Sequence, residues 1–102
     1  MNAKIYKVGP ALDATSAKVE QEGILAFLDE GTSVVIDLSE TTYVSSAGLR
    51  VLLYSYKVGK IHGKDVCLVG VCKEVKDVMK MTGFEHFFKI YDTLEECEKE
   101  IV

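Results

Sequence analysis

Two adjacent serines, Ser45 and Ser46, stand where a polar loop gives way to an apolar, helix-like pattern, and Gly48 follows them. The first backbone N–H groups of a helix lack intrahelical acceptors, and the helix dipole places about half a positive charge there. A phosphate or another anion is stabilised at such a position. We therefore interpret Ser46 as an N-cap that is also placed to accept a phosphate.

Gly48 falls in the first turn of the predicted helix, where glycine costs about 1 kcal/mol relative to alanine. Capping by a neighbouring serine does not explain a glycine at this position. The missing Cβ would let another backbone segment, or a partner protein, come close to the helix.

The helix that begins near Ser46 is predicted to end at about His62, and it carries apolar residues on two sides. At about 100° per residue, the stripe that we take as core consists of Leu49, Leu52, Leu53 and Tyr56. The opposite stripe consists of Ala47, Val51, Tyr54, Val58 and Ile61. Either neighbouring helices bury the second stripe, or it is at least partly exposed and forms a surface for a partner.

Short strand-like segments alternate with helical segments along the chain. The predicted strands are Lys4–Val8, Ser33–Leu38, Val66–Val69 and Lys89–Tyr91. The first predicted helix follows a cap at Asp13, Thr15 or Ser16 and ends at about residue 30. The next two span about 46–62 and 73–81, and a last helix carries Leu94, Cys97 and Ile101. This alternation predicts an α/β fold, with a mainly parallel central sheet, about four helices and right-handed crossovers. The β-branched run from 34 to 36 predicts a strand that is buried on both faces.

Two helix ends carry specific sequence signals. Gly83 suits the left-handed position that follows a helix C-terminus. The last helix can begin with either of two capping boxes, Asp92 with Glu95 or Thr93 with Glu96.

The cysteines do not form a metal-binding pattern. We interpret Cys67 as part of a strand core and Cys97 as a helix residue, and we leave Cys72 unassigned. Their spacing matches no zinc motif, so no metal is expected. Neither a glycine-rich dinucleotide loop nor a P-loop is present, so no cofactor is expected either.

Composition limits the classes of partner. At 102 residues and a formal charge of −4, the chain has the size of one domain, residues 1–102, and lacks a basic cluster that could follow a nucleic-acid backbone. No apolar run approaches the roughly 20 residues of a membrane span. Residues 1–9 contain no apolar segment typical of a secretory signal. We expect a cytoplasmic protein whose partner is another protein or a small polar ligand, with no direct nucleic-acid or membrane partner.

Candidates for enzyme catalysis are few. His62 stands at a predicted helix end, and His86 lies among aromatic residues that suit a core. The chain contains no G-x-S-x-G nucleophile elbow. We expect a binding protein and no enzymatic activity.

The segment around the two serines resembles the STAS family, which contains the bacterial anti-sigma factor antagonists. The matching residues are Asp37-Leu38-Ser39, Tyr43-Val44 and Ser46-Ala47-Gly48-Leu49, together with Leu12-Asp13 and the run 91–96. The resemblance extends from about Pro10 to the end of the chain. Members usually have two strands before the Leu-Asp pair, whereas nine residues leave room for one, so the first strand is missing here or supplied otherwise.

The resemblance implies a partner-switching cycle. The unphosphorylated protein would bind an anti-sigma factor serine kinase and thereby free a sigma factor, and phosphorylation would release it until a serine phosphatase resets the cycle. The residue that matches the family's phosphoacceptor is Ser46. The family's usual acidic residue before it is replaced by Ser45, which makes Ser45 a second candidate acceptor. An alternative function is a STAS-type scaffold or ligand-sensing module in a signalling assembly.

The predicted partner surface surrounds the phosphoacceptor. Asp13 is carried over from the family as a polar neighbour of Ser46, and capping of the first helix is an equally good interpretation of this residue. The residues that we expect to contact a partner are Asp13, Ser45, Ser46, Ala47, Gly48, Arg50, Val51, Tyr54 and Val58.

Overall fold

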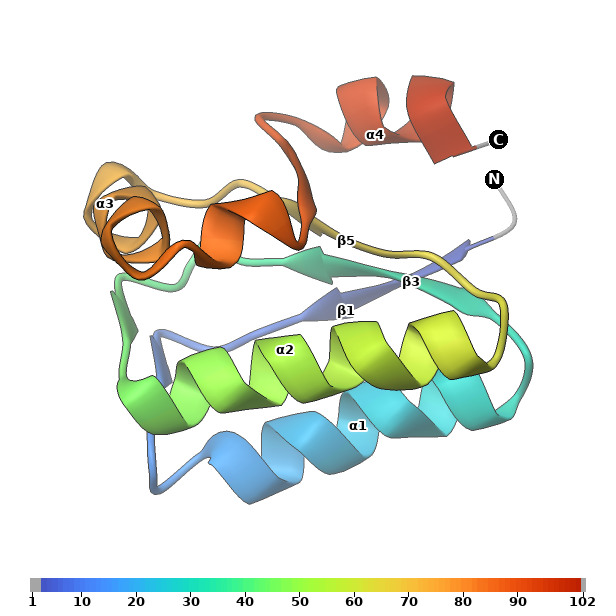
Figure 1. The fold of residues 1–102 in the computed structure, drawn as a ribbon, viewed down its shortest axis with the longest axis horizontal. Coiled ribbons are helices and arrows are strands. Elements are labelled where there is room, and N and C mark those ends of the chain that lie inside the picture. Colours follow the sequence, from blue (N-terminus) through green and yellow to red (C-terminus); the bar gives the residue numbers. More distant parts are fainter. Residues whose placement is uncertain (1–2, 102) are drawn as a thin grey trace.

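A computed structural model describes residues 3–101 as strands and helices in alternation (Figure 1). The strands are β1 (Ala3–Lys7), β2 (Ala11–Leu12), β3 (Ser33–Asp37), β4 (Tyr43–Val44), β5 (Val66–Val69) and β6 (Lys89–Tyr91). The helices are α1 (Ala17–Asp29), α2 (Ser46–Ile61), α3 (Lys73–Thr82) and α4 (Leu94–Ile101), with a 3₁₀ turn, η1 (Phe84–His86), before β6. The predicted α/β class is confirmed.

The central sheet has four strands in the order β1-β3-β5-β6, and every neighbouring pair is parallel. Its register aligns Ile5 with Val35, Val35 with Cys67, and Cys67 with Lys89. The two short strands β2 and β4 form a separate parallel pair. Parallel pairing requires crossover helices, which α1, α2 and α3 provide.

Helices cover both faces of the central sheet, but unequally. One core cluster contains Val34, Ile36 and Leu68 together with buried residues of α1, α2 and α3. A smaller cluster on the other face contains Val35, Cys67, Val69 and Cys97. In Figure 1, α4 (red) lies on the opposite side of the sheet from α1 (blue) and α2 (green). The predicted burial of the 34–36 run on both faces is confirmed.

The N-terminal part of the sheet has one full strand before the Leu12-Asp13 pair. β1 lies at the edge of the sheet and pairs with β3, and the second segment, β2, is two residues long and itself contains Leu12. Within residues 3–101, β1 is therefore the one strand that ends before the Leu12-Asp13 pair, as the length of this segment predicted.

The signals for helix ends are found where they were expected. Gly83 follows α3 with a φ of 78°, in the left-handed region. Of the two possible capping boxes, the structure has the second: Thr93 Oγ1 accepts a hydrogen bond from the Glu96 N–H at 3.2 Å. The Glu96 carboxylate accepts from the Asp92 N–H at 3.2 Å, and not from the Thr93 N–H that a complete capping box would use. Cys72, which had no assignment, is the N-cap residue of α3.

Candidate functional site

The loop that precedes α2 is held against the segment from Val8 to Leu12. Thr41 is buried, and its hydroxyl donates to the Gly9 carbonyl at 2.7 Å. The Ser45 N–H donates to the Leu12 carbonyl at 3.0 Å, which continues the β2–β4 pairing up to the helix. The start of α2 is thus fixed to the small sheet, with its first residues next to the end of β2.

Ser45, and not Ser46, is the N-cap of α2. Ser45 has extended backbone angles (φ −84°, ψ 177°), and its hydroxyl accepts from the Gly48 N–H at 3.3 Å. Ser46 is the first helical residue and is exposed. The prediction that Ser46 caps the helix is wrong by one residue, because capping requires the extended backbone that Ser45 adopts. Among the hydrogen bonds found for residues 3–101, none uses the Ser46 hydroxyl.

Gly48 allows α2 to approach the protein's own backbone. A Cβ at this position would lie 2.2 Å from the Leu12 carbonyl oxygen and 2.9 Å from a side-chain carbon of Val44. Gly48 itself is buried. Of the two explanations for this glycine, the close approach of another backbone segment is therefore the one observed. Because Gly48 is buried, it cannot contact a partner directly.

Asp13 is engaged at the start of α1. Its carboxylate accepts from the Thr15 hydroxyl at 2.7 Å, from the Thr15 N–H at 2.9 Å and from the Ser16 N–H at 3.2 Å. The hydrogen bonds from Thr15 are the main reason that the pKa of Asp13 lies below its ordinary value. Asp13 follows Leu12 in β2 as Ser45 follows Val44 in β4, so both lie at the same end of the small sheet. Its observed role is to organise the turn into α1; the N-cap residue of α1 is Ser16, so the interpretation of Asp13 as the cap is wrong.

The outer face of α2 begins at Ser46. Ser46, Arg50 and Tyr54 are spaced four residues apart and are all exposed, Tyr54 by 50%. The same face continues to Ile61, which is 82% exposed. Tyr43, in the preceding strand, is also exposed, by 55%, although the sequence analysis did not treat it as a contact residue. The available signal was an aromatic residue in the short apolar break of an otherwise polar loop.

The second apolar stripe of α2 is not exposed as a whole. Val51 is only 4% exposed and belongs to the main core cluster, while Ala47 and Val58 are half-buried. This corrects the expectation for Val51. The reason is that α1 packs along α2, as Figure 1 shows, and both helices contribute to that cluster. Tyr54 and Ile61 remain as the exposed part of the stripe.

Comparison with known proteins identifies the family. The family model for the STAS domain matches residues 1–97. The chain belongs to the STAS domain family. A curated relative, the "Putative anti-sigma factor antagonist BtrV" of Bordetella bronchiseptica, is 33% identical over 89 residues, which cover 85% of this chain and 75% of the relative.

Solved structures share the fold of this STAS domain. The crystal structure of "a putative anti-sigma factor antagonist (tm1081)" from Thermotoga maritima has a TM-score of 0.87 at 24% identity and covers 95% of this chain and 86% of its own. The Bacillus cell fate determinant SpoIIAA in its phosphorylated form has a TM-score of 0.74 at 12% identity, with 100% and 94% covered. The predicted STAS-like fold is confirmed.

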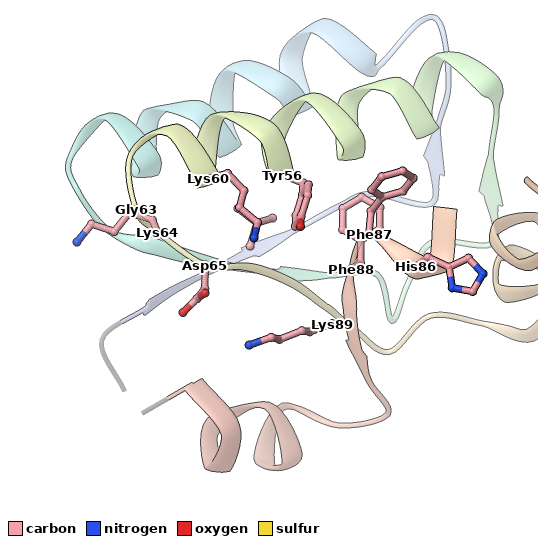
Figure 2. Close-up of a pocket in the computed structure, with 10 residues that line it drawn as sticks. Tyr56, Lys60, Gly63, Lys64, Asp65, His86, Phe87, Phe88 and Lys89 are labelled. Carbon is pink, nitrogen blue, oxygen red and sulfur yellow. The ribbon is translucent and has the colours of Figure 1, made fainter. Parts of the chain in front are cut away.

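A cavity of about 380 Å³ lies at the far end of α2 from Ser46. Its lining includes Tyr56, Lys60, Asp65, Phe88 and Lys89. Figure 2 shows Lys60 and Asp65 on one side of the two phenylalanines of this cavity and His86 on the other. No serine or cysteine is among the lining residues, so the cavity lacks the Ser–His or Cys–His pairing of a common activated nucleophile. Tyr56 is ten residues after Ser46, about 15 Å along the helix, so the cavity is separate from the phosphoacceptor candidates.

The described residues were also compared with the requirements of a metal site and of a membrane-spanning helix. In the part of the chain that the structure describes, no group of three or more His, Cys, Asp or Glu side chains is placed to hold a metal ion. None of the helices between residues 3 and 101 combines the length and apolar character that a membrane span requires.

Proposed function

We propose that this STAS domain is an anti-sigma factor antagonist that binds an anti-sigma factor serine kinase through the start and outer face of α2, and that phosphorylation of Ser46 releases it. The observation that carries the proposal is that Ser46 is an exposed residue at the first position of α2. The names of the similar proteins, anti-sigma factor antagonists and a phosphorylated SpoIIAA, support the same assignment. This role is one of binding and regulation in the cytoplasm, without catalysis by the domain itself.

The start of α2 is suited to a phosphate. A phosphoserine carries a charge of about −1.5 to −2 at neutral pH, and backbone N–H groups and the helix dipole stabilise it at a helix N-terminus. The first turn of α2 contains no acidic residue, whereas the first turns of α1, α3 and α4 each contain at least one. Arg50, one helical turn after Ser46, adds a positive charge on the same face.

Ser46 is a better acceptor than Ser45. The Ser45 hydroxyl is half-buried and accepts the Gly48 N–H, so its modification would disturb the N-cap of α2. Loss of a serine N-cap costs about 1 kcal/mol. The Ser46 hydroxyl can enter a kinase active site without breaking a hydrogen bond within residues 3–101.

The same location explains how a phosphate would end the complex. A partner that covers Ser46, Arg50 and Tyr54 must exclude water from this face of α2. A doubly charged group at its edge then opposes binding through desolvation and repulsion. Ser45, Ala47 and Val58 border the proposed surface, whereas Gly48 and Val51 support it from inside the fold. A serine phosphatase would restore the binding form.

The test is phosphorylation of the full chain by candidate anti-sigma factor kinases with ATP, followed by intact mass measurement and peptide mapping. We expect a gain of one phosphate that maps to Ser46. Ser46→Ala should abolish the gain, and Ser45→Ala, the matched control, should keep it. Transfer to another residue would contradict the assignment of Ser46. Absence of both transfer and a kinase complex would favour the alternative of a scaffold or ligand-sensing module.

A further inference from the structure

β5 and α4 bring two cysteines together on the α4 side of the sheet. Sγ of Cys67, in β5, lies 2.9 Å from Sγ of Cys97, in α4, and the two residues are 30 positions apart in the sequence. Both are 0% exposed. They are surrounded by Val35 and Val69, with Leu94 packed beside them. This pair plays no part in the function proposed above.

We propose that Cys67 and Cys97 are a redox-modification site, which closes to an intramolecular disulfide under oxidising conditions and fixes α4 to the central sheet. A disulfide has an S–S distance of about 2.05 Å, so the two sulfurs must approach by less than ~1 Å. Small changes of the two side-chain torsions can supply this shift, since both sulfurs already face each other as a thiol–thiol hydrogen bond.

The arrangement is selective for this pair. The third cysteine, Cys72, is half-buried at the start of α3 and packs against the main core cluster, on the other side of the sheet. Within residues 3–101, Cys67 and Cys97 are not part of a group of side chains that could share a metal ion. Reversible oxidation to a disulfide is therefore the reaction that we expect of these two thiols.

Thiol–disulfide exchange with a low-molecular-weight disulfide would form the bond in two steps. The thiolate of one cysteine attacks a sulfur of the small disulfide, which gives a mixed disulfide and releases one small thiolate. The second cysteine then attacks the protein sulfur of the mixed disulfide and displaces the second small thiolate. In sum, two cysteine thiols are oxidised to one disulfide, one small disulfide is reduced to two small thiols, and the two thiol protons pass to them.

Burial controls when this reaction takes place. Removal from water raises the pKa of both thiols, and for Cys67 the hydrogen bond with Cys97 raises it further. The docked pair is therefore in the unreactive thiol form at neutral pH. The first attack requires local opening of α4, a helix of eight residues that packs on β5 and β6. Once formed, the disulfide prevents that opening.

The experiment equilibrates the folded 102-residue chain with oxidised glutathione, alkylates the remaining thiols in denaturant so that buried thiols also react, and measures the intact mass and the disulfide-linked peptides. We expect one alkylated cysteine, Cys72, after oxidation and three after reduction. The oxidised form should have a Tm higher by roughly 10 °C, because a 30-residue loop is closed in the unfolded chain. Cys72→Ser, the matched control, should retain the shift, and Cys97→Ala should lose it.

Alkylation and thermal denaturation of the wild-type protein test the proposal even if the Cys97→Ala variant is unstable. Three alkylated cysteines after oxidation of the folded protein would overturn the proposal. A disulfide that includes Cys72, or a lasting glutathione adduct without an internal bond, would do the same. An oxidised form with an unchanged or lower Tm would show that the bond does not fix α4.

Discussion

Ser45 and Ser46 are adjacent, yet their hydroxyls are in different situations. Ser45 accepts a backbone N–H and is half-buried, whereas Ser46 is exposed at the first residue of α2. In the proposed switch, capping by Ser45 and phosphate acceptance by Ser46 would be separate, so that each residue could be changed without the other. For a switch this matters, because the fold must persist in both states while the exposed hydroxyl is modified.

Tyr6 supplies a prediction about alkaline pH. Its hydroxyl donates to a Glu20 carboxylate oxygen at 2.8 Å, and its ring packs edge-on against Phe27. Burial, followed by the hydrogen bond to Glu20, raises the pKa of Tyr6 to about 12. The folded protein thus favours the neutral phenol more than the unfolded chain does, where the pKa is about 10. This contribution to stability is complete below pH of about 10 and is lost as the pH rises toward about 12.

We expect Tyr6→Phe to have a smaller fall in unfolding free energy between pH 10 and pH 12 than the wild type, measured by urea denaturation at each pH. Tyr43→Phe, at an exposed tyrosine, serves as the control and should follow the wild-type pH dependence. Equal slopes for Tyr6→Phe and the wild type would show that the Tyr6–Glu20 contact is not pH-linked to folding.

At the scale of elements, the contact between α2 and the small β2–β4 sheet positions the whole site. The Leu12 carbonyl accepts the Ser45 N–H, and Gly48 brings the first turn of α2 against the same carbonyl. The spacing of apolar residues on α2 indicated two stripes, but it left open whether neighbouring helices would cover the second one, which includes Val51. Burial of a helix face depends on its neighbour as much as on its own sequence.

A methyl group at Gly48 should separate α2 from β2. Gly48→Ala places a Cβ 2.2 Å from a backbone carbonyl, which cannot move aside as a flexible side chain can. Overpacking of this kind costs about 1–3 kcal/mol, more than the ~1 kcal/mol that alanine gains from helix propensity. We expect a lower urea midpoint with an unchanged m-value.

Gly9→Ala is the matched control for Gly48→Ala. A Cβ at Gly9 meets nothing within 4 Å, and this glycine is not among those with positive φ. We expect its stability to stay close to that of the wild type. If Gly48→Ala were as stable as Gly9→Ala, the close approach of α2 to the Leu12 carbonyl would not require a glycine.

On the scale of the whole molecule, the proposed phosphorylation site and the cysteine pair lie in separate parts of the fold. The first residues of α2 are anchored to the small sheet, and Cys67 and Cys97 lie between the central sheet and α4, on the face opposite α1 and α2 (Figure 1). The two core clusters share no buried residue. A charge added at Ser46 therefore acts at the surface, without a change to the core.

This separation predicts that the Ser46→Asp variant folds as the wild type does but binds its partner more weakly. A carboxylate at the start of α2 should alter the unfolding free energy by no more than about 1 kcal/mol, and in the stabilising direction. Affinity for the anti-sigma factor kinase should fall by about tenfold or more, which corresponds to ~1.4 kcal/mol. Calorimetric titration and thermal denaturation measure the two quantities. Ser46→Asn, which is uncharged and of similar size, is the control that should bind more tightly than Ser46→Asp.

Much of this protein follows from local patterns that are independent of long-range contacts. Alternating β-branched strands and helical segments determined the parallel α/β fold, since such strands need crossover helices. The glycine after α3 and the Thr93–Glu96 hydrogen bond at the start of α4 depend on residues within a few positions of one another. The serine pair at the start of α2 was recognisable for the same reason.

Only the tertiary structure decided which neighbours these elements meet. The backbone angles that make Ser45 the cap arise because its N–H is held by Leu12, from a distant part of the chain. Val51 is buried because α1 packs beside α2, and Cys67 meets Cys97 because α4 folds back over β5. Sequence periodicity reports which side of an element is apolar, whereas the partner for that side is chosen by packing across the whole chain.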